Sequence, residues 1–247
     1  MGAELAIVGE VLCESIPVHA GDRVLDVGTA SGNTAISAAR RRGIVTGVDL
    51  VPSLLGHARK RAEAEGFEID FQEGNAMALS FEDASFDVVL STFGAIFAPD
   101  PNRTAAEMAR VCRLGGKIGL ASWPPDSMLG KLFLLLAQYS APGSGVDVPV
   151  EWGDEAVVAE RLGPYVRDLR VQRRAVRFRA LSAEDWVEFM RTHFGPAIEA
   201  FEQSKTPDAQ SNLAQKMAAL IREHNCAYNG TVLGNSEYLE IVATRGK

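Results

Sequence analysis

Two glycines and one aspartate near the start of the chain have the types and spacing of a nucleotide-binding turn. The turn reads Asp26-Val-Gly28-Thr-Ala-Ser-Gly32, and it lies between a short apolar segment and an alanine-rich one. Glycine lets the backbone adopt conformations, and approach a ligand, in ways that a Cβ would obstruct. An ordinary strand-to-helix turn also often contains glycine, so this turn by itself does not identify a ligand.

Asp49 supplies the second part of the pattern. It ends the next apolar segment and stands 21 positions after Gly28. A carboxylate at that place can accept two hydrogen bonds from the vicinal hydroxyls of a ribose. The alternative interpretation is an acid that favours the dipole of the following helix. The two roles are compatible, and the spacing favours the ribose.

A third segment separates two kinds of nucleotide cofactor. Gly74-Asn75-Ala76 begins a run that continues to Phe81, and a second apolar run, Phe86-Asp-Val-Val-Leu-Ser91, follows it. A nicotinamide-dependent oxidoreductase would share the turn and the terminal acid. Its usual G-x-G-x-x-G is absent from this chain, and such an enzyme has no place for the run from Asn75 to Phe81.

Alternating strands and helices must position these residues. The periodicity predicts an amphipathic helix over the first 15 residues, then five strands and three helices up to residue 122. Such alternation implies right-handed crossovers and a parallel sheet with helices on both faces. Beyond Trp123 we predict helices at 127–139, 154–162, 183–192 and 208–227, a Gly/Pro-rich loop at 141–153, and strands at 171–180 and 238–244.

Taken together, these segments resemble the class I S-adenosylmethionine-dependent methyltransferases, especially the ubiquinone/menaquinone C-methyltransferase-like (type 11) branch. The resemblance extends over about residues 21–122 and rests on four segments in family order: Val24–Asn33, Gly47-Val-Asp49, Gly74–Phe81 with Phe86-Asp-Val-Val, and Glu107–Gly116. The chain departs from the family at Ala30, which is often a third glycine, and at Leu114, which is often a proline. Alanine is small enough to be tolerated, and the second change affects a turn.

The resemblance implies a fold and a cofactor site. The expected fold is α/β: one doubly wound, Rossmann-like, mostly parallel seven-stranded sheet with helical insertions in the C-terminal half. Its expected parts are an N-terminal helix (1–20), a cofactor-binding core (21–123), substrate-side helical insertions (124–170 and 181–235) and a closing strand (236–247).

Thirteen residues are implied to hold S-adenosylmethionine. Asp49 would bind the ribose, Leu50 would contact the adenine, and Asn75 with Ala76 would meet the adenine edge. Ser91, Thr92 and Phe93 would line the site near the reactive methyl. The turn would border the methionine part through Asp26, Gly28, Thr29, Ala30, Ser31 and Gly32.

Methyl transfer from a sulfonium makes few demands on side chains. The leaving thioether is neutral, so alignment of nucleophile, methyl carbon and sulfur supplies much of the acceleration. A general base is needed only where the acceptor must lose a proton. The sequence shows no catalytic triad and no metal-ligand spacing, and the candidates for a base or substrate contact are His193 and Tyr139.

Three further features leave alternatives open. Phe97, Trp123 and Trp152 could wall an apolar pocket or belong to the core. The apolar helix at 129–137 could be a lid or core helix over the pocket, or a dimer surface. Six arginines between residues 167 and 179 could form a solvated or charged sheet edge, or a site for an acidic substrate or RNA.

The net charge, the cysteines and the lengths of the apolar runs limit the classes of function that we expect. A net charge of −7 lacks the basic excess that nucleic-acid binding usually needs. Three scattered cysteines and the lack of a long apolar run suit a cytoplasmic protein that spans no membrane. We expect a methyltransferase that moves a methyl group to O, C or N of a small metabolite, as a monomer or homodimer. The alternatives are an RNA or protein methyltransferase and a non-catalytic cofactor-binding protein with the same fold.

Overall fold

A computed structural model describes residues 4–139 and 148–246 of the chain. In this part, one seven-stranded sheet has the order β3-β2-β1-β4-β5-β7-β6. The five strands from β3 to β5 are parallel, and β7 is antiparallel to both of its neighbours. The strands are β1 (Arg23–Val27), β2 (Ile44–Asp49), β3 (Asp70–Glu73), β4 (Phe86–Thr92), β5 (Cys112–Ser122), β6 (Val166–Ala180) and β7 (Val232–Arg245). The predicted mostly parallel, Rossmann-like sheet is confirmed.

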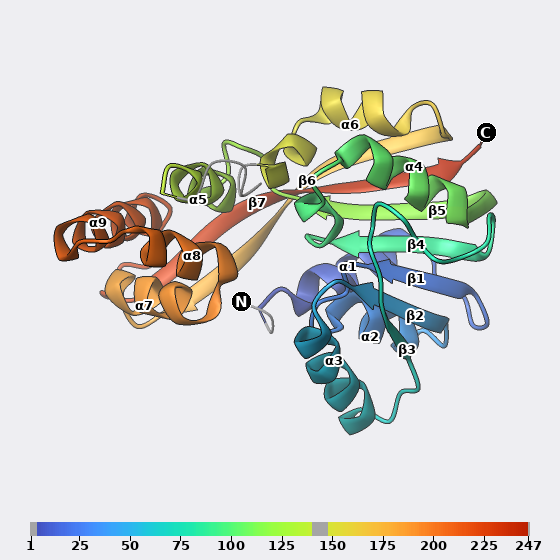
Figure 1. The fold of residues 1–247 in the computed structure, drawn as a ribbon, viewed down its shortest axis with the longest axis horizontal. Coiled ribbons are helices and arrows are strands. Elements are labelled where there is room, and N and C mark those ends of the chain that lie inside the picture. Colours follow the sequence, from blue (N-terminus) through green and yellow to red (C-terminus); the bar gives the residue numbers. More distant parts are fainter. Residues whose placement is uncertain (1–3, 140–147, 247) are drawn as a thin grey trace.

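Helices cover both faces of this sheet, as Figure 1 shows. One face packs on α1 (Ala6–Ser15), α2 (Asn33–Arg40) and α3 (Pro52–Ala64), through a core that includes Leu12, Ile36 and Leu55. The other face packs on α4 (Pro101–Val111) and α6 (Glu155–Leu162). From β1 the chain adds β2 and β3 toward one edge of the sheet, and from β4 it adds β5 toward the other edge. Because each βαβ unit is right-handed, α2 and α3 therefore lie on one face and α4 on the other.

The last helices form a lobe at one end of the sheet. This helical lobe consists of α5 (Met128–Ala137), α7 (Ala183–His193), α8 (Gly195–Gln203) and α9 (Pro207–Glu223). The β6–β7 ribbon reaches it because β6 pairs with β7 as far as Ala180↔Val232, whereas β5 pairs only with the Leu239–Thr244 part of β7. In Figure 1 the ribbon runs from the main sheet to the lobe on the left.

Several predicted boundaries differ from the observed ones. β6 begins at Val166 rather than residue 171, and β7 begins at Val232 rather than near residue 238, so both strands extend into segments that we expected to be helical insertions. Helix α8 was not predicted, and α9 ends at Glu223 rather than residue 227. The polar, arginine-rich start of β6 hides the alternation of a strand, and pairing with β7 overrides it. Residues 141–147 of the expected loop lie outside the described part of the chain, and residues 148–153 form a short 3₁₀ helix (η2).

The arginines of β6 lie on the outer strand of the sheet. Arg177 and Arg179 share an exposed face, as their alternation predicted. Arg174 lies on the other face, where its Nε is 2.8 Å from Oε2 of the buried Glu240. This arrangement agrees with the interpretation as a charged sheet edge, which discourages pairing with other chains.

Helix α5 is a core helix. Its residues Met128, Leu129, Leu132, Phe133 and Leu136 are all buried, which favours the lid or core interpretation over a dimer surface. In the part of the chain that the structure describes, no helix combines the length and apolar character needed to cross a membrane.

Candidate active site

A cavity of about 540 Å³ opens where four neighbouring strands end. Its walls include Gly28 after β1, Asp49 at the end of β2, Thr92 at the end of β4 and Trp123 after β5. The helical lobe supplies the opposite wall through Phe133 of α5 and through Phe194 and Pro196 at the start of α8. Carboxyl ends of strands at a switch in strand order are the usual ligand site of such sheets.

Ten of the thirteen residues assigned to the cofactor line this cavity. They come from four segments that lie far apart in the sequence and that the parallel sheet brings together: Gly28, Thr29, Ala30, Ser31, Asp49, Leu50, Asn75, Ala76, Thr92 and Phe93. The remaining three, Asp26, Gly32 and Ser91, do not line it.

The turn after β1 has an unusual backbone. Gly28, Ala30 and Gly32 all have positive φ angles, of 66°, 46° and 82°. Only glycine adopts this left-handed region without cost, and a residue with a Cβ pays roughly 1 kcal/mol there. The conformation explains why the related proteins often have glycine at position 30. The Ala30 N–H donates to Asp49 Oδ2 at 2.8 Å, which ties the turn to β2.

Gly28 and Gly94 bring two loops into direct backbone contact. A Cβ on Gly28 would lie 2.6 Å from the Cα of Gly94, and a Cβ on Gly94 would lie 2.2 Å from the carbonyl oxygen of Gly28. The preceding residue, Phe93, has a φ of 58°, a strained value for a bulky side chain. Gly94 was not among the predicted site residues. A glycine two positions after the end of β4, next to the predicted site residues Thr92 and Phe93, is the sequence feature that could have indicated it.

Asp49 is oriented by two backbone N–H groups. Its Oδ2 accepts from Ala30, and its Oδ1 accepts from Val51 at 2.9 Å. A carboxylate has about four acceptor positions, so lone pairs remain for a ligand. Leu50, which is 59% exposed, lies with Leu54 at the same end of the cavity. Asn75 is also fixed, because its Oδ1 accepts from the Met77 N–H at 2.9 Å.

Three of the predicted cofactor residues do not line the cavity but pack behind its walls. Gly32 is the residue before α2, and a Cβ there would press on Ala58 and Phe71 at 3.2 Å. Ser91 Oγ donates to the carbonyl of Val27 and accepts from the N–H of Ala95, so it joins β1 to the segment after β4. Sequence spacing located these residues correctly along the chain but could not say which way each side chain points.

Asp26 is buried beneath the turn, with 1% of its surface exposed. Its Oδ2 accepts from Thr29 Oγ1 at 2.7 Å and from the Ala35 N–H at 3.0 Å. Its Oδ1 is buried and has no hydrogen-bond partner among the described residues. Burial, opposed in part by these hydrogen bonds, raises the pKa of Asp26 to about 7.

The raised pKa of Asp26 predicts a specific dependence of stability on pH. A carboxyl group whose pKa is higher in the folded than in the unfolded state stabilises the fold while it is protonated, and this stability is lost as pH rises from about 4 to about 7. The stability of Asp26→Asn relative to the natural protein should therefore rise between pH 5 and pH 8, by roughly 3 kcal/mol. Urea unfolding of both proteins at the two pH values measures the difference. Parallel pH profiles would contradict the assignment.

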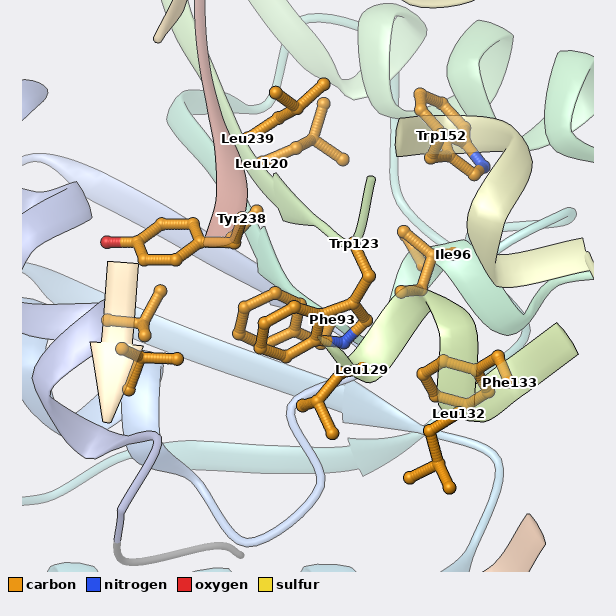
Figure 2. Close-up of a cluster of buried hydrophobic side chains, with 14 of the residues drawn as sticks. Phe93, Ile96, Leu120, Trp123, Leu129, Leu132, Phe133, Trp152, Tyr238 and Leu239 are labelled. Atoms are coloured by element: carbon orange, nitrogen blue, oxygen red, sulfur yellow. The ribbon is translucent and has the colours of Figure 1, made fainter. Parts of the chain in front are cut away.

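Aromatic rings form the rest of the cavity wall. Phe93 stacks on Trp123 with ring centroids 3.8 Å apart and an interplanar angle of 4°. Figure 2 shows the two rings face to face, with Tyr238 beside them and Phe133 further along the same cluster. Phe133 meets Phe97 and Phe194 edge to face, at 5.6 and 5.7 Å.

The expectation that aromatic residues wall a pocket is met in two positions of three. Phe97 and Trp123 line the cavity, whereas Trp152 is fully buried and does not. The Nε1 of Trp152 has no hydrogen-bond partner among the described residues, and the guanidinium of Arg161 lies 5.1 Å from the centroid of its ring.

The two candidates for a catalytic base lie outside the cavity. His193 is exposed, stacks on Phe189 and has its Nδ1 2.6 Å from Thr192 Oγ1. The Tyr139 hydroxyl donates to Asn212 Oδ1 and accepts from Lys216 Nζ, both at 2.9 Å. The lobe folds so that both side chains face away from the site. Among the described residues that line the cavity, Asp49 is the only one with an ionisable side chain.

Comparison with known proteins identifies the family. Residues 24–116 match the model of a methyltransferase domain. A demethylmenaquinone methyltransferase of Deinococcus radiodurans is 37% identical over 175 residues, which cover 65% of this chain and 73% of that protein. The chain belongs to the class I S-adenosylmethionine-dependent methyltransferases.

Two further similarities concern the length of the chain and its fold. An uncharacterized protein of Mycobacterium tuberculosis is 39% identical over 225 residues, 90% of this chain and 82% of that protein. The YcgJ protein of Bacillus subtilis has the same fold, with a TM-score of 0.65 over the whole of both chains at 20% identity. Membership of this family excludes the nicotinamide-dependent alternative and makes the chain an enzyme.

Proposed function

We propose that this methyltransferase binds S-adenosylmethionine in the cavity described above and transfers its methyl group to a small-molecule acceptor by in-line displacement. The observation that carries the proposal is the convergence of ten expected cofactor residues on one cavity. A cavity of about 540 Å³ lies within the range of small-molecule sites, 300–1,000 Å³.

The residues present fit the cofactor. Close backbone contact between Gly28 and Gly94 holds together the two loops that line the cavity. Asp49 presents a carboxylate, held by Ala30 and Val51, to the two hydroxyls of a ribose. Asp26, buried beneath the turn at 28–32, supports it through Thr29 and Ala35. Leu50 and Leu54 supply apolar surface for the adenine, with Asn75 at its edge.

The bound cofactor supplies an electrophilic methyl group whose departure leaves a neutral thioether. The chain itself contributes orientation and exclusion of water. The turn at 28–32 and Asp49 would hold the cofactor, and the aromatic side chains of the cavity would hold the acceptor. The two reactants then meet in a fixed geometry. The lobe covers the cavity through Phe133, Phe194 and Pro196, which keeps water from the reacting groups.

Transfer of a labelled methyl group tests this proposal. The purified protein, supplied with S-adenosylmethionine labelled in its methyl group, should move label into one or a few fractions of a native metabolite extract. Treatment of the extract with ribonuclease and protease should leave that transfer unchanged. Loss of label after either treatment would point to an RNA or protein acceptor, and calorimetry that detects no binding of S-adenosylhomocysteine would exclude the cofactor role of the cavity.

A further inference from the structure

We infer that Arg61 is a positioning residue for the methionine part of the cofactor: from α3 it fixes Ser31 and Asn33 as hydrogen-bond donors to the carboxylate of that part. The inference rests on the proposed function, since it concerns how the cavity holds the cofactor. Arg61 does not itself line the cavity, and it was not among the predicted site residues.

One nitrogen of the Arg61 guanidinium holds both residues. Its Nη1 donates to the carbonyl oxygen of Ser31 at 2.5 Å, to Ser31 Oγ at 3.2 Å and to Asn33 Oδ1 at 2.8 Å. Ser31 belongs to the turn at 28–32, and Asn33 is the first residue of α2. Arg61 therefore ties the start of α2 to a helix that lies about 30 positions later in the chain.

These hydrogen bonds decide which atoms the two side chains offer to a ligand. A guanidinium has donors only, so the Asn33 amide turns its oxygen toward Arg61 and carries its NH2 group on the opposite side. Ser31 Oγ is likewise an acceptor of Arg61, which leaves its hydroxyl hydrogen to be donated elsewhere. Because Ser31 and Asn33 both line the cavity, Arg61 makes donors of two side chains in its wall.

The carboxylate is the part of the cofactor that needs such donors. The described lining contains no lysine, arginine or histidine, and its one ionisable side chain, Asp49, is itself negative. Burying a carboxylate without hydrogen bonds is strongly unfavourable. Donors in the wall must therefore stabilise it, and the positive charge of Arg61 behind them adds to the attraction.

Other donors of the same turn are already engaged. The N–H groups of Thr29, Ala30 and Gly32 all donate to oxygens of described residues, at 2.8–2.9 Å. The Thr29 hydroxyl donates to Asp26 Oδ2 at 2.7 Å. The carboxylate therefore depends on the two side chains that Arg61 holds.

Two ligands that differ only in the carboxylate test the inference. S-adenosylhomocysteine carries this group, whereas decarboxylated S-adenosylhomocysteine lacks it and keeps the ammonium, the ribose and the adenine. In calorimetry, Arg61→Met should weaken the binding of S-adenosylhomocysteine about tenfold, which corresponds to one hydrogen bond to a charged group. Binding of the decarboxylated ligand should not change. An equal loss for both ligands, or no loss for either, would overturn the inference, because a purely structural role acts on both alike.

Arg59→Met is the matched control. Arg59 lies two positions earlier on α3, and its Nη2 donates to the carbonyl oxygen of Phe71, at 2.5 Å, instead of to the turn. This variant removes the same charge from the same helix and should bind both ligands as the natural protein does. If it lost as much affinity for S-adenosylhomocysteine as Arg61→Met, the effect would belong to the charge of the helix, and the inference would be wrong.

Asn33→Asp tests the donor while Arg61 stays in place. It replaces the NH2 group with an oxygen of similar size, and an acid is favourable in the first turn of a helix, so the fold should be retained. Two carboxylates would then meet, and the affinity for S-adenosylhomocysteine should fall at least about tenfold, while the decarboxylated ligand keeps or gains affinity. Unchanged binding of S-adenosylhomocysteine would contradict the inference.

Binding by the natural protein separates this inference from the proposed function. If the natural protein binds neither ligand, the proposed function fails and the role of Arg61 fails with it. If it binds S-adenosylhomocysteine, but the Arg61 and Asn33 variants do not discriminate between the two ligands, only the role of Arg61 is removed.

Discussion

Replacing Asp49 with alanine should weaken the binding of S-adenosylhomocysteine at least tenfold. The carboxylate is held by the N–H groups of Ala30 and Val51, and its remaining lone pairs are available to the two ribose hydroxyls. A hydrogen bond to a charged group contributes about 1.5–3 kcal/mol, and 1.4 kcal/mol corresponds to a factor of ten in affinity. Loss of one such bond predicts a reduction of at least about tenfold, and loss of both predicts about a hundredfold or more, measured by calorimetry.

Two further variants separate the ribose contact from the support of the turn. Asp49→Asn keeps an oxygen that can accept one backbone N–H but has no charge, so we expect an affinity between those of the natural protein and Asp49→Ala. Glu73 ends the neighbouring strand β3, pairs in register with Asp49, is exposed and does not line the cavity. Glu73→Ala should bind S-adenosylhomocysteine as the natural protein does. An Asp49→Ala variant that retains full affinity would remove Asp49 from the site.

Gly94→Ala is expected to destabilise the fold and to impair the cofactor site together. The added Cβ would lie 2.2 Å from the carbonyl oxygen of Gly28. This neighbour is backbone and cannot rotate away, so the β1 and β4 loops must separate. Overpacking of this kind costs about 1–3 kcal/mol, and the displaced loop is the one that holds Ala30 and Asp49. Urea unfolding should show the loss of stability, and calorimetry a lower affinity for S-adenosylhomocysteine.

Gly56→Ala is the matched control for this substitution. Gly56 lies in α3, and a Cβ there would meet nothing within 4 Å. In a helix interior, alanine is more favourable than glycine by roughly 0.5–1 kcal/mol, so this variant should be as stable as the natural protein or slightly more stable, with unchanged affinity. Equal behaviour of Gly94→Ala and Gly56→Ala would show that the close approach of the two loops is not required.

The parallel core of the fold was predictable because its signals are local. Strands β1, β2 and β4 are short and largely apolar, and a glycine turn follows β1 while an acid ends β2. Gly28 and Asp49 were therefore placed correctly at the carboxyl ends of β1 and β2. The longer β6 and β7 and the extra helix α8 were not predicted in full, because pairing between strands 50 or more residues apart decides them rather than local pattern.

Spacing along the chain predicted which segments contain the proposed cofactor residues, but it did not predict which of their side chains line the cavity. Asp26 and Gly28 are two positions apart, and yet one is buried under the turn while the other lines the cavity. Residues two positions apart share a face within a strand, so the difference arises at the end of β1, where the backbone enters the left-handed region at Gly28. The orphaned Oδ1 of Asp26 and its raised pKa follow from that burial, and no sequence pattern indicates them.

The sequence by itself determined that a class I methyltransferase core is present and where its glycine turn and Asp49 lie, because these depend on residue type and spacing within about 50 residues. Only the tertiary structure decided which residues line the cavity opposite them. Phe93, Phe97, Trp123, Phe133 and Phe194 become one wall because the sheet and the helical lobe meet there. Tyr139 and His193 lie outside the cavity, where they contact Asn212 and Phe189. Packing between distant segments determines where these side chains point, and such packing produces no periodic pattern in the sequence.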